Sequence, residues 1–522
     1  MVQLDFSLIM GKTCLERDHV RKKWYFLIFI IIILANVSTT TAAAAGDLPD
    51  DAEMQERLWL VEQFVSRQFE RNDLIGGIYG IIHQDTLIHE QAYGTTSKQA
   101  QITPDATTRY AVASVTKALT ATAIYKLQEE GLLDVDKSVR TYIPGFRFQG
   151  EDDVNPVTLR HLLTHSAGGV GSQTDAQLFE HDARNSLADY VEVMKQIELT
   201  EQPGTTGNYC NGCFDLLGHV IEQVTDLSYY DYMEQSIFEP LGMHATIYGE
   251  QLDTIPASKV ADEYHWFFTR KIQLGRNFES FGTSQDPDGG AYSTLEDLVK
   301  YVAFQLGYGE QNLLRADSTL DARAPFVPTE AGDAYYTASG FEVKHWHGTD
   351  IYWKFGDGMG SGSAVLFIPE YELGLVLLYG EFYPFIQTPI IEGMASILMG
   401  YEPIVPEPTA PIGKISWIAI AIATIGLLLL SILARAWKRR ERSYAKPLWR
   451  SVAASILWGG ISAGIGYVLL FLRPSGMGFY GFPYDAALGL ILFVTVSILI
   501  FLYNLYILLS RRSNNHSAAG KP

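Results

Sequence analysis

The sequence predicts an α/β chain of the α+β type, in which an antiparallel sheet is flanked by helices and joined to an all-helical subdomain. Two patterns in residues 46–402 lead to this prediction: strand-like runs stand near both ends of the segment, and helix and loop signals dominate from residue 158 to about residue 305. Strands from both ends can pair in one sheet, with the helical segment as an insertion. A third pattern, three long apolar runs after residue 412, predicts membrane helices behind this domain.

The first predicted elements are a helix, a hairpin and a second helix. Apolar residues recur at helical spacing from Asp51 to Asp73. The runs Ile78–His83 and Thr86–Tyr93 flank two polar residues and predict a hairpin. A helix is expected from Ser114 to Glu130, followed by a glycine. Strands return late, at Phe341–Trp346, Ile351–Phe355, Ala364–Ile368 and Leu373–Tyr379.

The N-terminal residues 1–45 have the pattern of a secretory signal. Basic residues precede an apolar run from Trp24 to Ala35, and small residues follow as far as Ala45. An uncleaved anchor is the alternative, because the segment from Trp24 to Ala45 is just long enough to span a bilayer. In both cases the next segment is exported.

The C-terminal residues 413–522 are predicted to cross the membrane three times, at about residues 415–436, 451–472 and 486–509. Each run reaches the roughly 20 residues that a spanning helix needs and has no polar face. Basic residues between the first two runs, and Arg511 and Arg512 at the end, predict a cytoplasmic side. A Pro-rich linker at residues 403–412 precedes them. We therefore expect a multi-pass protein of the cell membrane, with the lipid bilayer as a partner and residues 46–402 outside.

The formal net charge of the whole chain is −20, and the segment outside the membrane is more acidic still, because many of the basic residues lie at the two ends. So acidic a surface repels nucleic acid, which we exclude as a partner.

The sharpest chemical signal is Ala113-Ser114-Val115-Thr116-Lys117. Residues three apart share a helix face, so the hydroxyl of Ser114 and the amine of Lys117 can meet. A serine hydroxyl becomes a strong nucleophile when a neighbouring base removes its proton. Because Ser-x-x-Lys is common by chance, the pair gains its meaning from the blocks around it.

These blocks resemble the serine β-lactamase and penicillin-binding protein superfamily, specifically its class C branch. The resemblance covers residues 110–134, 157–168, 202–211, 238–243, 289–297 and 356–374, in the family's order. It implies that Ser114 is acylated, that Lys117 activates it and that Tyr209 relays protons. It also implies that Asn211 hydrogen-bonds the substrate amide, and that the backbone N–H groups of Ser114 and Gly360 form the oxyanion hole.

The third motif departs from the family pattern, which is usually Lys-Thr-Gly or His-x-Gly on a strand. The matching triplet is taken as Asp357-Gly358-Met359, so an anion stands where a cation is expected. One interpretation is that Asp357 meets the substrate and favours neutral or cationic groups; the other is that it caps a turn. This departure puts β-lactamase and D,D-carboxypeptidase activity in doubt.

The remaining candidates are cysteines and histidines. Cys210 and Cys213 bracket Asn211, and their export slightly favours a disulfide over two thiols. His161 and His165 match a structural block of the resemblance, and no metal or other cofactor is expected. The predicted function is hydrolysis of an ester, amide or peptide through an acyl-serine, with a small molecule or peptide as substrate. The alternative is a catalytically weak, penicillin-binding-like scaffold protein of the cell envelope.

Overall fold

The structure is a computed structural model. It describes residues 51–171, 186–267, 270–274, 286–309, 313–329, 332–383 and 386–403. The predicted signal, nearly all of the Pro-rich linker and the three predicted membrane helices lie outside these residues. Among the helices that are described, none is both long and apolar enough to cross a bilayer.

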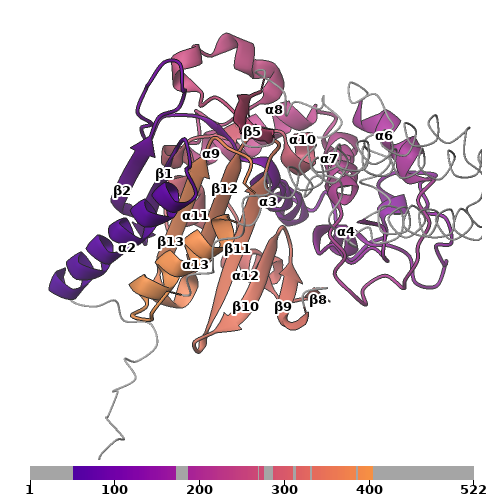
Figure 1. Cartoon of the computed structure of the whole chain (residues 1–522). Helices are drawn as coiled ribbons and strands as arrows, with labels where there is room; N and C mark the ends of the chain where they lie inside the picture. The colour runs from indigo at the N-terminus through magenta and orange to yellow at the C-terminus, as the bar shows by residue number, and fades with distance from the viewer. Residues whose placement is uncertain are drawn as a thin grey trace, which may run out of the picture. The chain divides into compact units, whose positions relative to one another are not determined.

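An eight-stranded antiparallel sheet forms the centre of the domain, with the order β2-β1-β13-β12-β11-β10-β9-β8 (Figure 1). Pairing of β1 with β13 joins the start of the domain to its end, as the sequence predicts. The strands are β1 (Gly76–His83), β2 (Thr86–Gly94), β8 (Pro328–Thr329), β9 (Gly332–Ala338), β10 (Phe341–Trp346), β11 (Thr349–Asp357), β12 (Gly362–Ile368) and β13 (Leu373–Tyr379).

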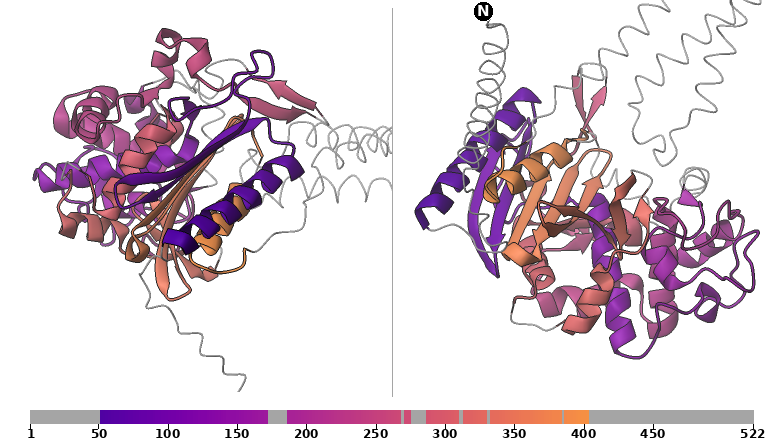
Figure 2. Two further views of the ribbon diagram at one scale, coloured as in Figure 1. Left: turned by 90° about the vertical axis from the view of Figure 1, so that its left-hand side faces the viewer. Right: turned by 90° about the horizontal axis from the view of Figure 1, so that it is seen from below.

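Helices cover both faces of this sheet. The first helix, α2 (Asp51–Arg71), packs with α13 (Gln387–Leu398) on one face, and α11 (Leu295–Leu306) packs on the other (Figure 2). The ring of Phe64 on α2 fills the space beside Gly393, where an added Cβ would come within 2.3 Å of it. The first and last described helices are thereby fixed to each other as well as to the sheet.

A helical subdomain is built around α3 (Thr116–Glu129), which is buried on nearly all sides between α7, α10 and α12. Its other helices are α4 (Leu159–Leu163), α6 (Leu187–Met194), α7 (Asn211–Thr225), α8 (Tyr229–Met233), α9 (Glu239–Leu241), α10 (Asp286–Gly289) and α12 (Ala316–Arg323). Because α3 has almost no solvent-facing side, the turn at its N-terminus is held rigidly.

The segment predicted to be helical also contains short strands, which is a correction. They are β4 (Ile247–Tyr248), β5 (Tyr264–Phe267), β6 (Arg270–Gln273) and β7 (Ala291–Ser293); β7 pairs with β4 and with β3 (Tyr110–Ala111). Strands of two to four residues are too short to show the alternation by which a strand is recognised.

Candidate active site

Ser114 lies in a 3-10 turn, η1 (Ala113–Val115), immediately before α3. The preceding residue, Ala113, has a left-handed backbone with φ of 43°, a conformation that costs energy for any residue with a Cβ. Thr116 stabilises the turn, since its hydroxyl donates to the carbonyl of Ala113 at 2.7 Å and accepts the N–H of Ala291 at 3.2 Å. The serine is half-buried, so its hydroxyl is presented at the edge of the subdomain.

Lys117 lies one turn further along and is fully buried. Its Nζ donates to Oγ of Ser114 at 3.1 Å, as the three-residue spacing predicts. The same nitrogen donates to the backbone oxygen and to Oδ2 of Asp288, at 2.7 and 3.2 Å. Burial disfavours the charged amine, but the carboxylate of Asp288 and the neighbouring Tyr209 outweigh it and raise the pKa of Lys117.

Tyr209 approaches the serine from the segment before α7. Its hydroxyl donates to Oγ of Ser114 at 2.7 Å. The ring lies 4.5 Å from that of His165, measured between centroids, and Nδ1 of His165 accepts the N–H of Cys210 at 3.1 Å. Cys210 and Cys213 are joined in a disulfide across the first turn of α7. These contacts hold the phenol in place.

Asn211 is the first residue of α7 and is half-buried. Phe214 follows three residues later on the same face of the helix, and its ring centroid lies 5.8 Å from Nζ of Lys117. Asn211 therefore starts the helix face that is turned toward Lys117. The structure thus brings Ser114, Lys117 and Tyr209 into direct contact, and Asn211 lies at the start of the adjoining helix α7.

Lys354 is a functional candidate that sequence reasoning missed. It lies on β11 and is 1% exposed, and its Nζ is 4.6 Å from the centroid of the Tyr209 ring. Two residues later, Gly356 lies against the serine turn, where an added Cβ would come within 2.1 Å of the carbonyl oxygen of Val112. Only glycine permits this approach.

The third motif is therefore Lys354-Phe355-Gly356, and the register that began it at Asp357 is wrong. This triplet has the Lys-x-Gly pattern, and it lies beside the nucleophile. Glycines at alternate positions of the tract Gly356-Asp357-Gly358-Met359-Gly360 make several registers equally plausible from sequence. The signal that could have selected the correct register was Lys354 itself, which lies two residues before the first glycine at the end of a predicted strand.

Asp357 and Gly360 are placed differently from the prediction. Asp357 is three residues from Lys354 on one strand, so their side chains point to opposite faces of the sheet. Its carboxyl group is hydrogen-bonded to Gln387 on α13, and desolvation raises its pKa although the residue remains accessible to solvent. The carbonyl of Gly360 accepts the N–H of Tyr264 at 3.1 Å, beside β5. The side chain of Asp357 is therefore directed to the face of β11 opposite Lys354, toward Gln387, and its contact with substrate stays a prediction.

The histidines weighed in the sequence have structural surroundings. Nδ1 of His161 accepts the N–H of Thr158 at the start of α4, and burial lowers the pKa of His161 to about 4. His165 is buried against Tyr209, and burial together with Lys354 and Lys117 holds its pKa well below the ordinary value. In the part of the chain that is described, no three His, Cys, Asp or Glu side chains form a group able to hold a metal ion.

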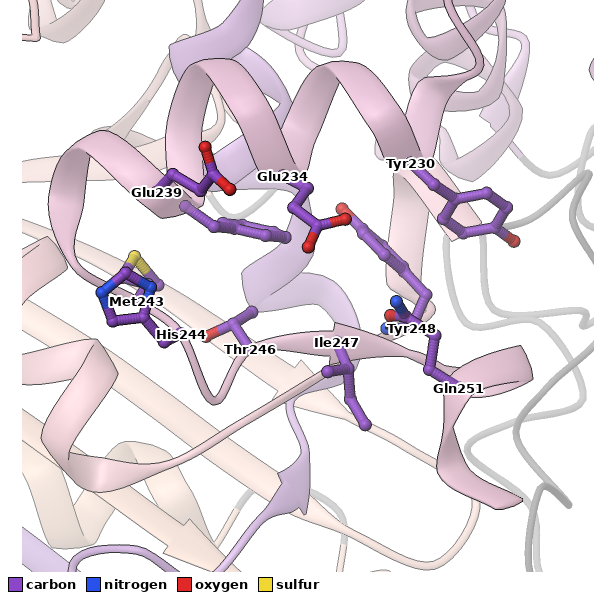
Figure 3. A pocket seen from close by; sticks show the side chains of 10 residues that line it. Tyr230, Glu234, Glu239, Met243, His244, Thr246, Ile247, Tyr248 and Gln251 are labelled. Carbon is purple, nitrogen blue, oxygen red and sulfur yellow. Dashed lines mark hydrogen bonds between the residues drawn. The ribbon is translucent and has the colours of Figure 1, made fainter. Parts of the chain in front are cut away.

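A separate pocket of about 190 Å³ lies between the π-helical turn η3 (Glu234–Phe238) and β4 (Figure 3). Tyr230, Tyr248 and His244 are among the residues that line it. None of the predicted site residues does, so this pocket is not where Ser114 would react.

The fold and the arrangement of Ser114, Lys117 and Tyr209 define a β-lactamase-like protein, and the comparison with known families agrees. Residues 61–388 match the family described as Beta-lactamase. This is more than half of the chain, and the chain belongs to that family.

Individual relatives are distant. The chain is similar to Protein flp of Staphylococcus aureus (strain N315), at 24% identity over 485 residues, which cover 87% of this chain and 92% of that protein. It is also similar to Putative beta-lactamase-like 1 of Homo sapiens, at 25% identity over 338 residues, covering 62% of this chain and 65% of that protein.

Among solved structures, the octameric penicillin-binding protein homologue from Pyrococcus abyssi has a TM-score of 0.59 at 22% identity. The match covers 69% of this chain and 81% of that one. A likeness at this level of identity shows the fold, and function has to be argued from the site.

Proposed function

We propose that the chain is a serine hydrolase that forms an acyl-Ser114 intermediate with an ester, amide or short peptide. One observation carries this proposal: Oγ of Ser114 accepts hydrogen bonds from both Nζ of Lys117, at 3.1 Å, and the hydroxyl of Tyr209, at 2.7 Å. A nucleophile between two groups that can exchange protons is the arrangement that acyl transfer requires. Lys117 takes the serine proton during attack, and Tyr209 delivers a proton to the leaving group. The Tyr-x-Asn element supports a place in the class C branch.

The oxyanion hole is assigned to the backbone N–H groups of Ser114 and Asp357, in place of Gly360. The N–H of Gly358 donates to the carbonyl of Ser361 at 3.0 Å, and Asp357 pairs with Gly362. Hydrogen-bonded and non-hydrogen-bonded pairs alternate in an antiparallel ladder. Asp357 and Gly362 are therefore a non-hydrogen-bonded pair, and the N–H of Asp357 points away from β12. It points to the opposite edge of β11, where pairing with β10 ends at Trp353.

The substrate class follows from the charge of Lys354. A buried ammonium beside Tyr209 binds an anion by a charge-assisted hydrogen bond, which is stronger than a neutral one. We therefore assign substrates that carry a carboxylate near the scissile bond, in place of the cationic substrates that an anion at the third motif favours. This restores β-lactams and D,D-peptides as candidates.

A location outside the cell, on a membrane anchor, is the second part of the proposal. The apolar runs after residue 412 and the basic loop between the first two support the anchor. The Cys210–Cys213 disulfide supports an oxidising compartment, since cytosolic thiols are kept reduced. The match to Protein flp spans 87% of this chain, so it extends beyond the segment that matches the family.

The alternative, a catalytically weak binding or scaffold protein, is favoured by one observation. Nζ of Lys117 is in contact with both the backbone and the carboxylate oxygen of Asp288. A lysine held as an ammonium by such a pair is a poor base, so slow turnover is compatible with the same fold.

Covalent labelling separates the two functions. The protein is incubated with a labelled fluorophosphonate, or with a labelled penicillin, and digested to map the modified peptide. Hydrolase function requires the label on Ser114. The label should be lost completely in Ser114→Ala, because the oxygen that would carry it is absent, and turnover should fall by several powers of ten. Absence of label from the wild-type protein, or equal labelling of Ser114→Ala, rejects the acyl-serine proposal.

A further inference from the structure

The environment of Lys117 differs from that of a free base. Its Nζ is surrounded by three oxygen atoms: Oγ of Ser114 at 3.1 Å, and the backbone oxygen and Oδ2 of Asp288 at 2.7 and 3.2 Å. A lysine ammonium has three donors and no acceptor, so these three oxygens saturate it. In this state Lys117 donates to Ser114 and has no lone pair with which to remove the serine proton.

Ser114 shows the same state from the other side. Its Oγ receives the hydroxyl of Tyr209 at 2.7 Å as well as the amine of Lys117. Both groups are donors to the serine, and neither can act as a base until Lys117 loses a proton. The geometry is thus that of an enzyme whose nucleophile has not yet been activated.

The partner carboxylate comes from the short helix α10, which carries Asp286 and Asp288. Asp286 is buried and Asp288 is half-buried, and α7 adds Asp215, which is fully buried. Desolvation and the charge of Asp288 raise the pKa of Asp286 to about 8, and the same two causes raise the pKa of Asp215 well above its ordinary value. Asp288 differs from these two groups in its direct contact with Nζ of Lys117, at 3.2 Å, which favours its carboxylate form.

The other groups facing the pair are Lys354, Tyr209 and His165. Desolvation raises the pKa of Asp288, and the charges of Lys117 and Lys354 act against that rise. His165 stays neutral because burial lowers its pKa. Within the described residues, Asp288 is thus the side chain that holds the charge on Lys117, at a contact of 3.2 Å.

We infer that Asp288 is a positioning residue that keeps Lys117 as an ammonium and thereby restrains Ser114, so that acylation proceeds only as the Lys117–Asp288 pair loses its proton. When that proton leaves to solvent, neutral Lys117 accepts the Oγ proton of Ser114 while the Oγ–acyl bond forms. The bond between the acyl group and the leaving group then breaks, the leaving group takes a proton from Tyr209, and Tyr209 regains a proton from the Lys117 ammonium, which ends neutral. This inference rests on the proposed serine hydrolase function.

The test is the rate of Ser114 labelling by a fluorophosphonate as a function of pH. An adjacent opposite charge shifts a pKa by about 1 to 3 units. Asp288→Asn keeps an oxygen acceptor and removes the charge, so it should move the rising limb of the rate to lower pH by at least about one unit. Below that limb, labelling should become about 10-fold faster or more than in the wild type. Asp288→Glu, which restores the carboxylate, should return the limb toward the wild-type position.

Asp286→Asn is the matched control, since it replaces a neutral acid on the same helix by its amide and has no contact with Lys117; its limb should stay in place. Thermal unfolding shows whether each variant is folded, and Asp288→Ser provides a second removal of the charge. The inference is overturned if Ser114 is labelled in the folded Asp288→Asn and Asp288→Ser variants with the wild-type pH profile. A wild-type protein that is not labelled at all contradicts the hydrolase function instead, so the two failures are distinct.

Discussion

The ammonium of Lys354 lies over the ring of Tyr209, with 4.6 Å between Nζ and the ring centroid. Nζ of Lys117 lies 5.1 Å from the same centroid, so the phenol that donates to Ser114 is flanked by two cations. The hydroxyl of Tyr209 thus contacts the nucleophile, while its ring contacts two lysine amines. In the proposed reaction Lys354 therefore lies next to both the phenol that relays protons and the carboxylate that the substrate is proposed to carry.

Lys354→Ala should weaken reaction with carboxylate-bearing substrates more than with neutral esters. Loss of a hydrogen bond to a charged group costs about 1.5–3 kcal/mol, which is about 10- to 100-fold in kcat/KM for a substrate that uses it. The measurement is kcat/KM for a matched pair of esters with and without a carboxylate. Lys259→Ala, which removes an exposed lysine, is the control. An equal loss for both esters would show that Lys354 does not contact the carboxylate.

Asp357→Lys tests the corrected register of the third motif. Since the carboxyl of Asp357 is bonded to Gln387 on the face opposite Lys354, the substitution should leave selectivity between anionic and cationic substrates unchanged. It should lower the free energy of unfolding by about 1–3 kcal/mol, because the hydrogen bond to Gln387 is lost where the carboxyl group is largely desolvated. Selectivity assays and chemical denaturation measure the two effects. A shift of selectivity toward carboxylates would return Asp357 to the substrate site.

Gly356→Ala should displace the strand from the serine turn. The new Cβ would lie 2.1 Å from the carbonyl oxygen of Val112, so the backbone has to move, and a displacement near 1 Å costs on the order of 100-fold in rate. Gly131→Ala is the control, since that glycine has open space around it and a φ of 76°. It should lose about 1–2 kcal/mol of stability and keep its labelling rate. A Gly356→Ala protein that labels normally would place β11 further from Ser114.

The Cys210–Cys213 disulfide should survive purification without reductant. Alkylation of the denatured protein, followed by mass spectrometry, should then modify neither cysteine, and prior reduction should expose both. Because the bridged loop is short, chain entropy contributes little, and its effect should be on the orientation of Tyr209, seen as slower labelling of Ser114 after reduction. Two free thiols in the untreated protein would contradict the bond.

The membrane topology predicted from sequence concerns residues beyond the described part of the chain. A cysteine introduced in the basic loop at residues 439–444 should resist a membrane-impermeant label in intact cells. One introduced at residues 475–479, between the second and third apolar runs, should react, because positive loops remain on the cytoplasmic side. The opposite pattern would reverse the proposed orientation and place the catalytic domain inside the cell.

The helix that follows Ser114, the hairpin of β1 and β2, and the bounds of β10 and β13 all follow from the sequence. Their signals are local, because apolar periodicity and turn residues lie within a single element. Ser114, Lys117, Tyr209 and Asn211 were predicted for a similar reason, since each lies in a short motif through which the chain resembles the family. The short strands between β4 and β7 carry no such signal.

The third motif and the partner of Lys117 were decided by the tertiary structure. In the glycine-rich tract after Lys354 the spacing permits several registers, and the close approach of Gly356 to Val112 selects one of them. Asp288 meets Lys117 across 171 residues of sequence, so no local pattern could have paired them. Periodicities and short motifs can be recognised in the sequence itself. The electrostatic environment of a buried lysine depends instead on which distant segments pack against it.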